Sequence, residues 1–336
     1  MLKRSFLFVP FCLLISFLFF FSTAHADGSD VAVAPVYPSN QISPNGIFDL
    51  KVSPGQIQTI HLKVVNLSKF TNSITVEPTT AYTSDSGLLA IDKVHAPESK
   101  RLQISFRKIV NKSDLKQHVT LSPNKVKIIS ITFRVPNKPF TGVTVGGLLV
   151  KSNNSETQGT GKGINLRNKF AYTMSVVLKE QKKVAQPRLT IGSVKPGKMD
   201  SNIIVNSVFN NVEPAVISDM KMTATITKIS NGKQMGKTSA NGLSVAPSSS
   251  YKYMNNWDSN NIFPGKYHYK AVFVTADGHH WTLEKDFNVN VLDSLALNNR
   301  NNPWIWYLII LLIILILILI LWYLIRKKLR EKREEN

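Results

Sequence analysis

The sequence predicts an all-β protein: two tandem immunoglobulin-like antiparallel β-sandwiches, followed by one transmembrane α-helix. Three observations lead to this prediction. Apolar and polar residues alternate with period two through much of residues 30–293, turn residues recur at short intervals, and one long uncharged segment lies near the C-terminus. Many short strands separated by turns are typical of sandwiches, and the chain between its two ends is long enough for two separate cores.

The alternation is clearest in two stretches. In QTIHLKVVN, the side chains of Ile60, Leu62 and Val64 fall on one face of the expected strand. A later strand alternates from Trp281 to Val291, and the run GKYHYKAVFVT lies just before it. Because Asp-Gly at 277–278 separates these two runs, we expect a β-hairpin with that pair in its turn.

We place the first sandwich at residues 30–150 and the second at residues 160–293. Residues 151–163 are polar and rich in Gly and Ser, which is typical of a linker. Strand patterns also flank this segment on both sides, so it could equally be a hairpin loop, with a strand at 170–178 closing the first sandwich. Both interpretations stay open at this point.

The C-terminal segment has the composition of a membrane span. Residues 304–325 contain no charged side chain, and at about 1.5 Å per residue they are long enough to cross a hydrocarbon core of roughly 30 Å. Aromatic residues stand at both ends, where headgroups would lie: Trp304, Trp306, Tyr307, Trp322 and Tyr323. The basic tail at 326–336 predicts a cytoplasmic C-terminus.

The N-terminus has the pattern of a signal peptide at residues 1–26. Lys3 and Arg4 precede an apolar run, and Ala24 and Ala26 form a small-x-small cleavage site. An uncleaved first membrane span is the alternative, and it would also leave the middle of the chain outside the cell. We therefore expect a single-pass cell-membrane protein with an extracellular N-terminal ectodomain.

Composition restricts the chemistry of that ectodomain. Cys12 is the only cysteine, so the mature chain has no disulfide, thiolate metal site or cysteine nucleophile. The 41 Lys and Arg outnumber the 21 Asp and Glu, and this excess of positive charge favours polyanionic partners such as wall phosphates or carboxylates. Solubility alone is the other explanation of the charge. Nucleic acid is a poor candidate partner outside a cell.

No catalytic motif emerges from the sequence, and we predict a protein that is not an enzyme and has no cofactor. Ser105 and Lys108 match the S-x-x-K pattern of penicillin-binding enzymes, but they lie in RLQISFRKIV, which alternates like a strand rather than starting a helix. Asp277, His279 and His280 resemble metal ligands by type. Adjacent histidines in a strand point to opposite faces, so we predict no metal site there.

Four stretches of the sequence resemble the WxL-interacting proteins of Gram-positive bacteria. They are SNQISPNGIFDLKVSPGQIQTIHLKVVNLS, VPNKPFTGVTVGGLLV, NKFAYTMSVVL and APSSSYKYMNNWDSNNIFPGKYHYKAVFVTADGHHWTLEKDFNV. The shared blocks are Asn40–Gln41, Phe48–Leu50, Pro54–Gln56, Gly146–Gly147 and Pro264–Tyr267.

The resemblance implies a membrane-anchored cell-surface binding scaffold. Its N-terminal domain would associate non-covalently with peptidoglycan, its C-terminal domain with host extracellular matrix proteins, and both would work beside WxL-domain proteins within and beyond the cell wall. Two alternatives are an adhesin for host proteins or glycans with incidental wall contact, and a wall-modifying enzyme. The candidate binding residues, each of which also has a packing interpretation, are Asn40, Gln41, Gln56, Tyr251, Tyr253 and Trp257.

Overall fold

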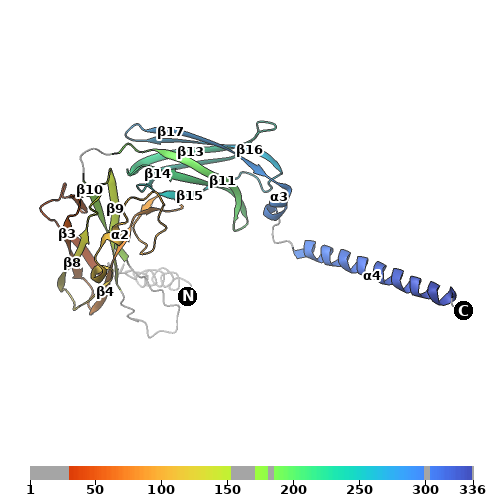
Figure 1. The fold of residues 1–336 in the computed structure, drawn as a ribbon, viewed down its shortest axis with the longest axis horizontal. Coiled ribbons are helices and arrows are strands. Elements are labelled where there is room, and N and C mark those ends of the chain that lie inside the picture. The colour runs from red at the N-terminus through yellow and green to blue at the C-terminus, as the bar shows by residue number, and fades with distance from the viewer. Residues whose placement is uncertain (1–29, 153–170, 181–184, 299–302, 335–336) are drawn as a thin grey trace, which may run out of the picture.

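The computed structural model describes residues 30–152, 171–180, 185–298 and 303–334. Figure 1 shows two bodies built of β-strands and one long helix that extends away from the second body. This architecture confirms the predicted fold class. The expected signal peptide at 1–26 and most of the polar segment 151–163 lie outside the described residues.

The first sandwich packs a three-stranded sheet against a five-stranded sheet. The smaller sheet has the order β1-β3-β8: β1 (Val31–Val36), β3 (Ile57–Asn66) and β8 (Val126–Arg134). The larger has the order β2-β10-β9-β4-β7: β2 (Phe48–Lys51), β10 (Ala171–Lys179), β9 (Val143–Ser152), β4 (Asn72–Thr80) and β7 (Gln117–Leu121).

The alternation predicted from the sequence accounts for the core of this sandwich. In β3, the side chains of Ile60, Leu62 and Val64 are fully buried between the sheets, whereas His61 and Lys63 face outward. A strand can present one apolar face in this way because successive side chains point to opposite sides.

Strand β10 belongs to the larger sheet of the first sandwich, although it follows the polar segment. It pairs antiparallel with β9 along its whole length, and its end, Val176 to Lys179, pairs in parallel with β2. This parallel pair departs from the all-antiparallel arrangement that we expected. The Lys179 ammonium lies 2.9 Å from a carboxylate oxygen of Asp49 in β2 and so ties the two strands together.

The second sandwich packs a three-stranded sheet against a four-stranded sheet. The first has the order β11-β12-β15: β11 (Leu189–Met199), β12 (Asn202–Asn211) and β15 (Ser250–Asn256). The second has the order β14-β13-β16-β17: β14 (Gln234–Val245), β13 (Ile217–Lys228), β16 (Gly265–Thr275) and β17 (His280–Val289). The predicted hairpin is confirmed, because β16 and β17 pair antiparallel around Asp277 and Gly278.

A small hairpin joins the two sandwiches. Its strands, β5 (Tyr82–Thr83) and β6 (Leu89–Ala90), belong to the first half of the chain. The Thr83 hydroxyl oxygen lies 2.6 Å from that of Ser249 and accepts a hydrogen bond from the amide of Ala246 at 3.0 Å. Buried apolar side chains pack around these contacts: Ala81, Ile91, Val143, Val145 and Ala246.

Two short helices lie in the loop between β6 and β7, and the first of them falls in RLQISFRKIV, which alternates like a strand. They are α2 (Phe106–Ile109) and η1 (Lys112–Asp114). The strand prediction was wrong because Phe106 alone supplies the buried anchor in α2, with its ring 5.3 Å from that of Phe133. Ser105 therefore stands at the start of a helix, as the S-x-x-K pattern requires.

The last two helices follow the second sandwich. α3 (Val291–Asn298) occupies residues that include the end of the alternating pattern, so Val291 is helical and not part of the strand. α4 (Pro303–Glu334) contains a candidate membrane span at Ile309–Arg326 that is long and apolar enough to cross a bilayer. Figure 1 shows α4 extending clear of both sandwiches.

The close approach of β9 to α2 gives a stability test. A Cβ atom on Gly146 would lie 2.4 Å from the ring of Phe106, so Gly146→Ala forces the two elements apart. We expect this substitution to lower the free energy of unfolding by about 1–3 kcal/mol, as overpacking does. Gly192→Ala is the control, because its Cβ meets nothing closer than 3.3 Å. Thermal unfolding of both variants measures the effect, and equal losses would contradict this account.

Candidate functional site

Two pockets lie on either side of the segment that follows β6. A basic pocket of about 400 Å³ belongs to the first sandwich, and a junction pocket of about 440 Å³ lies between the two sandwiches. Lys93 and Pro97 line the junction pocket, whereas Val94, His95 and Glu98 line the basic pocket. Both volumes fall in the range of roughly 300–1,000 Å³ that is usual for small-ligand sites.

Cations dominate the basic pocket. Arg107, Lys108 and Lys112 line it together with the imidazole of His95, and Glu98 is the one acidic side chain among its lining residues. The Nη1 atom of Arg107 donates to backbone carbonyls of β4 and the loop after η1, which fixes the position of the guanidinium. Neither Arg107 nor Lys112 forms an ion pair with a residue that the structure describes, so both charges remain available to an anion.

Glu98 holds two neighbours at the edge of this pocket. One of its carboxylate oxygens accepts a hydrogen bond from the Ser105 hydroxyl at 2.7 Å, and the other accepts one from the Lys108 ammonium at 2.5 Å. Partial burial by itself would raise the pKa of Glu98, but these two hydrogen bonds outweigh it and lower the pKa below its ordinary value. The carboxylate is therefore ionised at neutral pH.

This arrangement does not suit Ser105 as a nucleophile. Its hydroxyl proton is donated to Glu98, and the Lys108 side chain is 73% exposed and forms an ion pair with the same carboxylate. A serine–lysine pair needs a neutral amine within reach of the hydroxyl to act as the base. Ser105 thus stands at a helix start, as the S-x-x-K pattern requires, but its hydroxyl and the Lys108 ammonium bond to Glu98 at the edge of the pocket.

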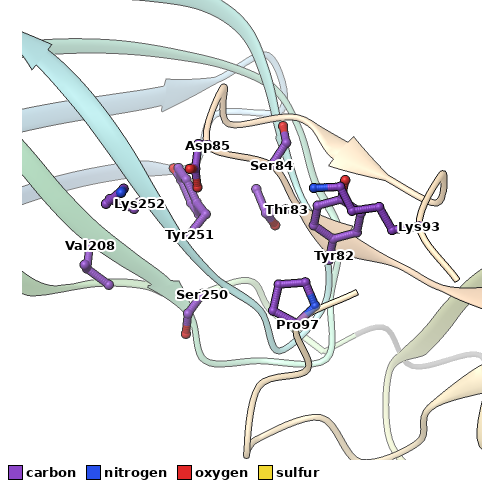
Figure 2. A pocket seen from close by; sticks show the side chains of 10 residues that line it. All are labelled: Tyr82, Thr83, Ser84, Asp85, Lys93, Pro97, Val208, Ser250, Tyr251 and Lys252. Atoms are coloured by element: carbon purple, nitrogen blue, oxygen red, sulfur yellow. The ribbon is translucent and has the colours of Figure 1, made fainter. Parts of the chain in front are cut away.

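The junction pocket has lining residues from both sandwiches. Figure 2 shows Tyr82 and Lys93 on one side of it and Val208, Tyr251 and Lys252 on the other. The Lys93 ammonium lies 4.9 Å from the centre of the Tyr82 ring. Ammonium and hydroxyl groups thus face the same hollow, and they can hydrogen-bond to a polar ligand.

The predicted binding residues of the first domain form a hydrogen-bond network. The side-chain amides of Asn40 and Gln56 both donate to the Gln58 side-chain oxygen, at 3.0 and 2.9 Å. Gln41 donates to the backbone carbonyls of Ser43 and Ile47. These contacts hold the segment before β2 and the turn before β3, and ligand binding by Asn40, Gln41 and Gln56 stays a prediction.

The predicted aromatic residues of the second domain lie in or against its core. Trp257 is buried, with its ring 5.3 Å from that of Tyr267, and its indole N–H donates to the carbonyl of Asn261. Tyr253 is partly buried against the same core. Tyr251 is buried, and burial raises the pKa of its phenol; it is also the one of the three that lines the junction pocket.

The Asp277, His279 and His280 group is explained by the hairpin turn. The Asp277 carboxylate accepts a hydrogen bond from the Thr275 hydroxyl, and the His279 ring stacks on Trp281 with centres 5.7 Å apart. Within the described ranges, no group of three or more His, Cys, Asp or Glu side chains is arranged to hold a metal ion.

The cations of the basic pocket were missed by the sequence analysis. Arg107 lies in RLQISFRKIV, which alternates like a strand, Lys112 follows it by two residues, and the chain is rich in Lys and Arg throughout. The one usable clue was the S-x-x-K match itself. A helix that starts at Ser105 places Arg107 and Lys108 in its first turns, and both side chains line the basic pocket.

Together, the fold and the pockets define a class: a two-sandwich binding protein with one candidate membrane span at its C-terminus. Two family models then match most of the chain. Residues 32–152 match the peptidoglycan binding domain of the WxL Interacting Protein, and residues 161–299 match its host binding domain. The chain therefore belongs to the WxL-interacting protein family, which confirms the resemblance seen in the sequence.

Other comparisons add little. A search of curated proteins gives no match. Among solved structures, the CsuC-CsuE chaperone and tip subunit complex of Acinetobacter baumannii is 11% identical, with a TM-score of 0.36, covering 76% of this chain and 98% of that one. The CupB2 chaperone of Pseudomonas aeruginosa is 15% identical, with a TM-score of 0.29, covering 69% and 93%. Likeness this weak carries no argument about function.

The lowered pKa of Glu98 predicts a pH-dependent contribution to stability. A carboxyl whose pKa is lower in the folded state stabilises the fold above its unfolded pKa, and this stability is lost as the pH falls through the folded value. We expect Glu98→Gln to lower the melting temperature at pH 7 and to have a shrinking effect as the pH falls below the ordinary value of 4.5. Melting curves of both proteins between pH 7 and pH 3 measure this, and a constant difference would contradict it.

Proposed function

We propose that this protein is a membrane-anchored surface scaffold whose first sandwich binds peptidoglycan through the basic pocket. The observation that carries the proposal is the coincidence of two findings. Residues 32–152 match a peptidoglycan binding domain, and the pocket lined by Arg107 and Lys112, which form no ion pair with a described residue, lies within that same range. The carboxylates of peptidoglycan stem peptides are suitable ligands, because a guanidinium binds a carboxylate through paired hydrogen bonds.

The remaining parts of the chain supply the anchor and a second contact surface. The candidate span in α4 would hold the protein in the cell membrane, with the sandwiches outside and the C-terminus in the cytoplasm. The match of residues 161–299 to a host binding domain supports contact of the second sandwich with host extracellular matrix. The family name supports a WxL-domain protein as a further partner.

The wall-binding proposal is tested by sedimentation with purified sacculi. We expect the full chain in detergent to sediment with sacculi, and Arg107→Ala with Lys112→Ala to weaken binding by about tenfold or more, since a hydrogen bond to a charged group contributes roughly 1.5–3 kcal/mol. Sacculi stripped of teichoic acid with hydrofluoric acid should bind equally well if the ligand is peptidoglycan.

Matched controls separate a specific pocket from general charge. Lys63→Ala with Lys127→Ala removes the same charge from exposed positions of β3 and β8 and should leave binding unchanged. Lys112→Glu alone covers the case in which loss of Arg107 disturbs folding. Equal weakening by both double variants would refute the pocket, and a wild-type chain that stays in the supernatant would refute wall binding.

A further inference from the structure

Helix α3 presents an apolar side to its surroundings. Three large apolar side chains of this helix are mostly exposed: Val291 61%, Leu292 77% and Leu295 63%. A surface helix of a water-soluble domain normally has the reverse arrangement, with its apolar stripe on the core and its polar side in water.

The opposite side of α3 is attached to the sandwich by the partly buried Leu297 and by polar groups. The Ser294 hydroxyl donates to the carbonyl oxygen of Ile262 at 2.7 Å, and the Asn298 side chain donates to the same oxygen at 2.9 Å. The Asn298 side-chain oxygen also accepts a hydrogen bond from the Ile262 amide at 2.8 Å. These bonds fix the rotation of the helix, so the apolar side cannot turn inward without breaking them.

Further apolar and basic side chains occur at the same end of the sandwich. Phe263, in the loop before β16, is 54% exposed, and Ile229, in the turn after β13, is 47% exposed. Strand register places these loops together, because the start of β16 pairs with both the end of β13 and the end of β17. The Lys228 ammonium lies 6.0 Å from the centre of the Phe263 ring, and Lys266 is exposed beside them.

This end of the sandwich is the one nearest the candidate span. α3 ends at Asn298 and α4 begins at Pro303, and a five-residue separation reaches roughly 18 Å at most. Figure 1 shows α3 at the end of the second sandwich from which the chain continues into α4. The other end of the second sandwich is occupied by the junction with the first.

We propose that α3, together with Phe263 and Ile229, forms a membrane-contact surface that lies in the headgroup region of the outer leaflet. The inference rests on the proposed anchoring through α4, which brings lipid within reach of the end of the second sandwich that carries these side chains. Apolar side chains with lysines beside them suit this interface, where the apolar groups enter the acyl boundary and the ammonium groups meet lipid phosphates. The contact would hold the second sandwich against the membrane.

Depth-dependent quenching tests the proposal. The full chain with Cys12→Ser and a single Leu295→Cys is labelled with an environment-sensitive fluorophore and reconstituted in vesicles of phosphatidylcholine and phosphatidylglycerol. We expect brominated phosphatidylcholine to quench this probe at least about twofold more than a probe at Val274→Cys, an exposed position at the far end of β16. A probe at Phe263→Cys should behave like the one at position 295.

Carbonate extraction separates the hypothesis that α4 is a membrane anchor from the hypothesis that α3, Phe263 and Ile229 form a membrane-contact surface. A chain that resists carbonate, with probes at 295 and 263 quenched more than the probe at 274, supports both the anchor and the contact surface. A chain that resists carbonate but shows equal quenching at all three positions overturns the contact surface and leaves the anchor standing. A chain that carbonate removes from the vesicles overturns the anchor, and the contact surface with it.

Discussion

The contact of the Thr83 hydroxyl with the Ser249 hydroxyl and the Ala246 amide is the interaction on which the rest of the structure depends. It brings the β5–β6 hairpin of the first sandwich against the second, and backbone bonds extend the contact, since Ser244 donates to the carbonyl of Gly87. All of these groups are buried or partly buried, and a buried polar group without a partner is costly. The junction therefore joins the two sandwiches through specific hydrogen bonds between buried or partly buried groups.

The junction also explains where the two pockets lie. The β5–β6 hairpin contacts the second sandwich. Lys93 and Pro97 of the segment that follows the hairpin line the junction pocket, and Val94, His95 and Glu98 line the basic pocket beside α2. Glu98 completes the arrangement because it holds Ser105 and Lys108 at the end of this segment. The two pockets thus lie on opposite sides of the same loop.

Much of the fold could be predicted because strand periodicity reports burial directly. Ile60, Leu62 and Val64 alternate in the sequence and are buried in the structure, and the Asp-Gly pair at 277–278 identifies its hairpin. The parallel pairing of β10 with β2 could not be predicted, because it joins residues about 130 positions apart in sequence and leaves no local pattern. The helix at α3 was missed for another reason: Val291, Leu292 and Leu295 face outward and Leu297 is its one apolar residue packed against the core, so its pattern is not that of a core helix.

The candidate site was less predictable than the fold. Asn40, Gln41 and Gln56 drew attention as shared blocks, yet the structure shows their side chains hydrogen-bonded to Gln58 in β3 or to nearby backbone, so a resemblance in sequence does not separate structural from functional positions. Arg107 and Lys112 carry no distinctive spacing in a basic chain. They become a site only when the loop after β6 folds against α2, which is a tertiary event.

The position of β10 has a consequence for the order in which the chain can fold. The first sandwich is closed by a strand that ends at Lys179, after the polar segment that follows β9. A chain made from its N-terminus therefore cannot complete its first core until residue 179 has emerged, and until then β2 and β9 have unpaired edges that are open to wrong partners. The added separation costs little in loop-closure entropy, because that cost grows only slowly with length. The first sandwich thus depends on a strand that emerges only just before the first strand of the second sandwich, β11, which begins at Leu189.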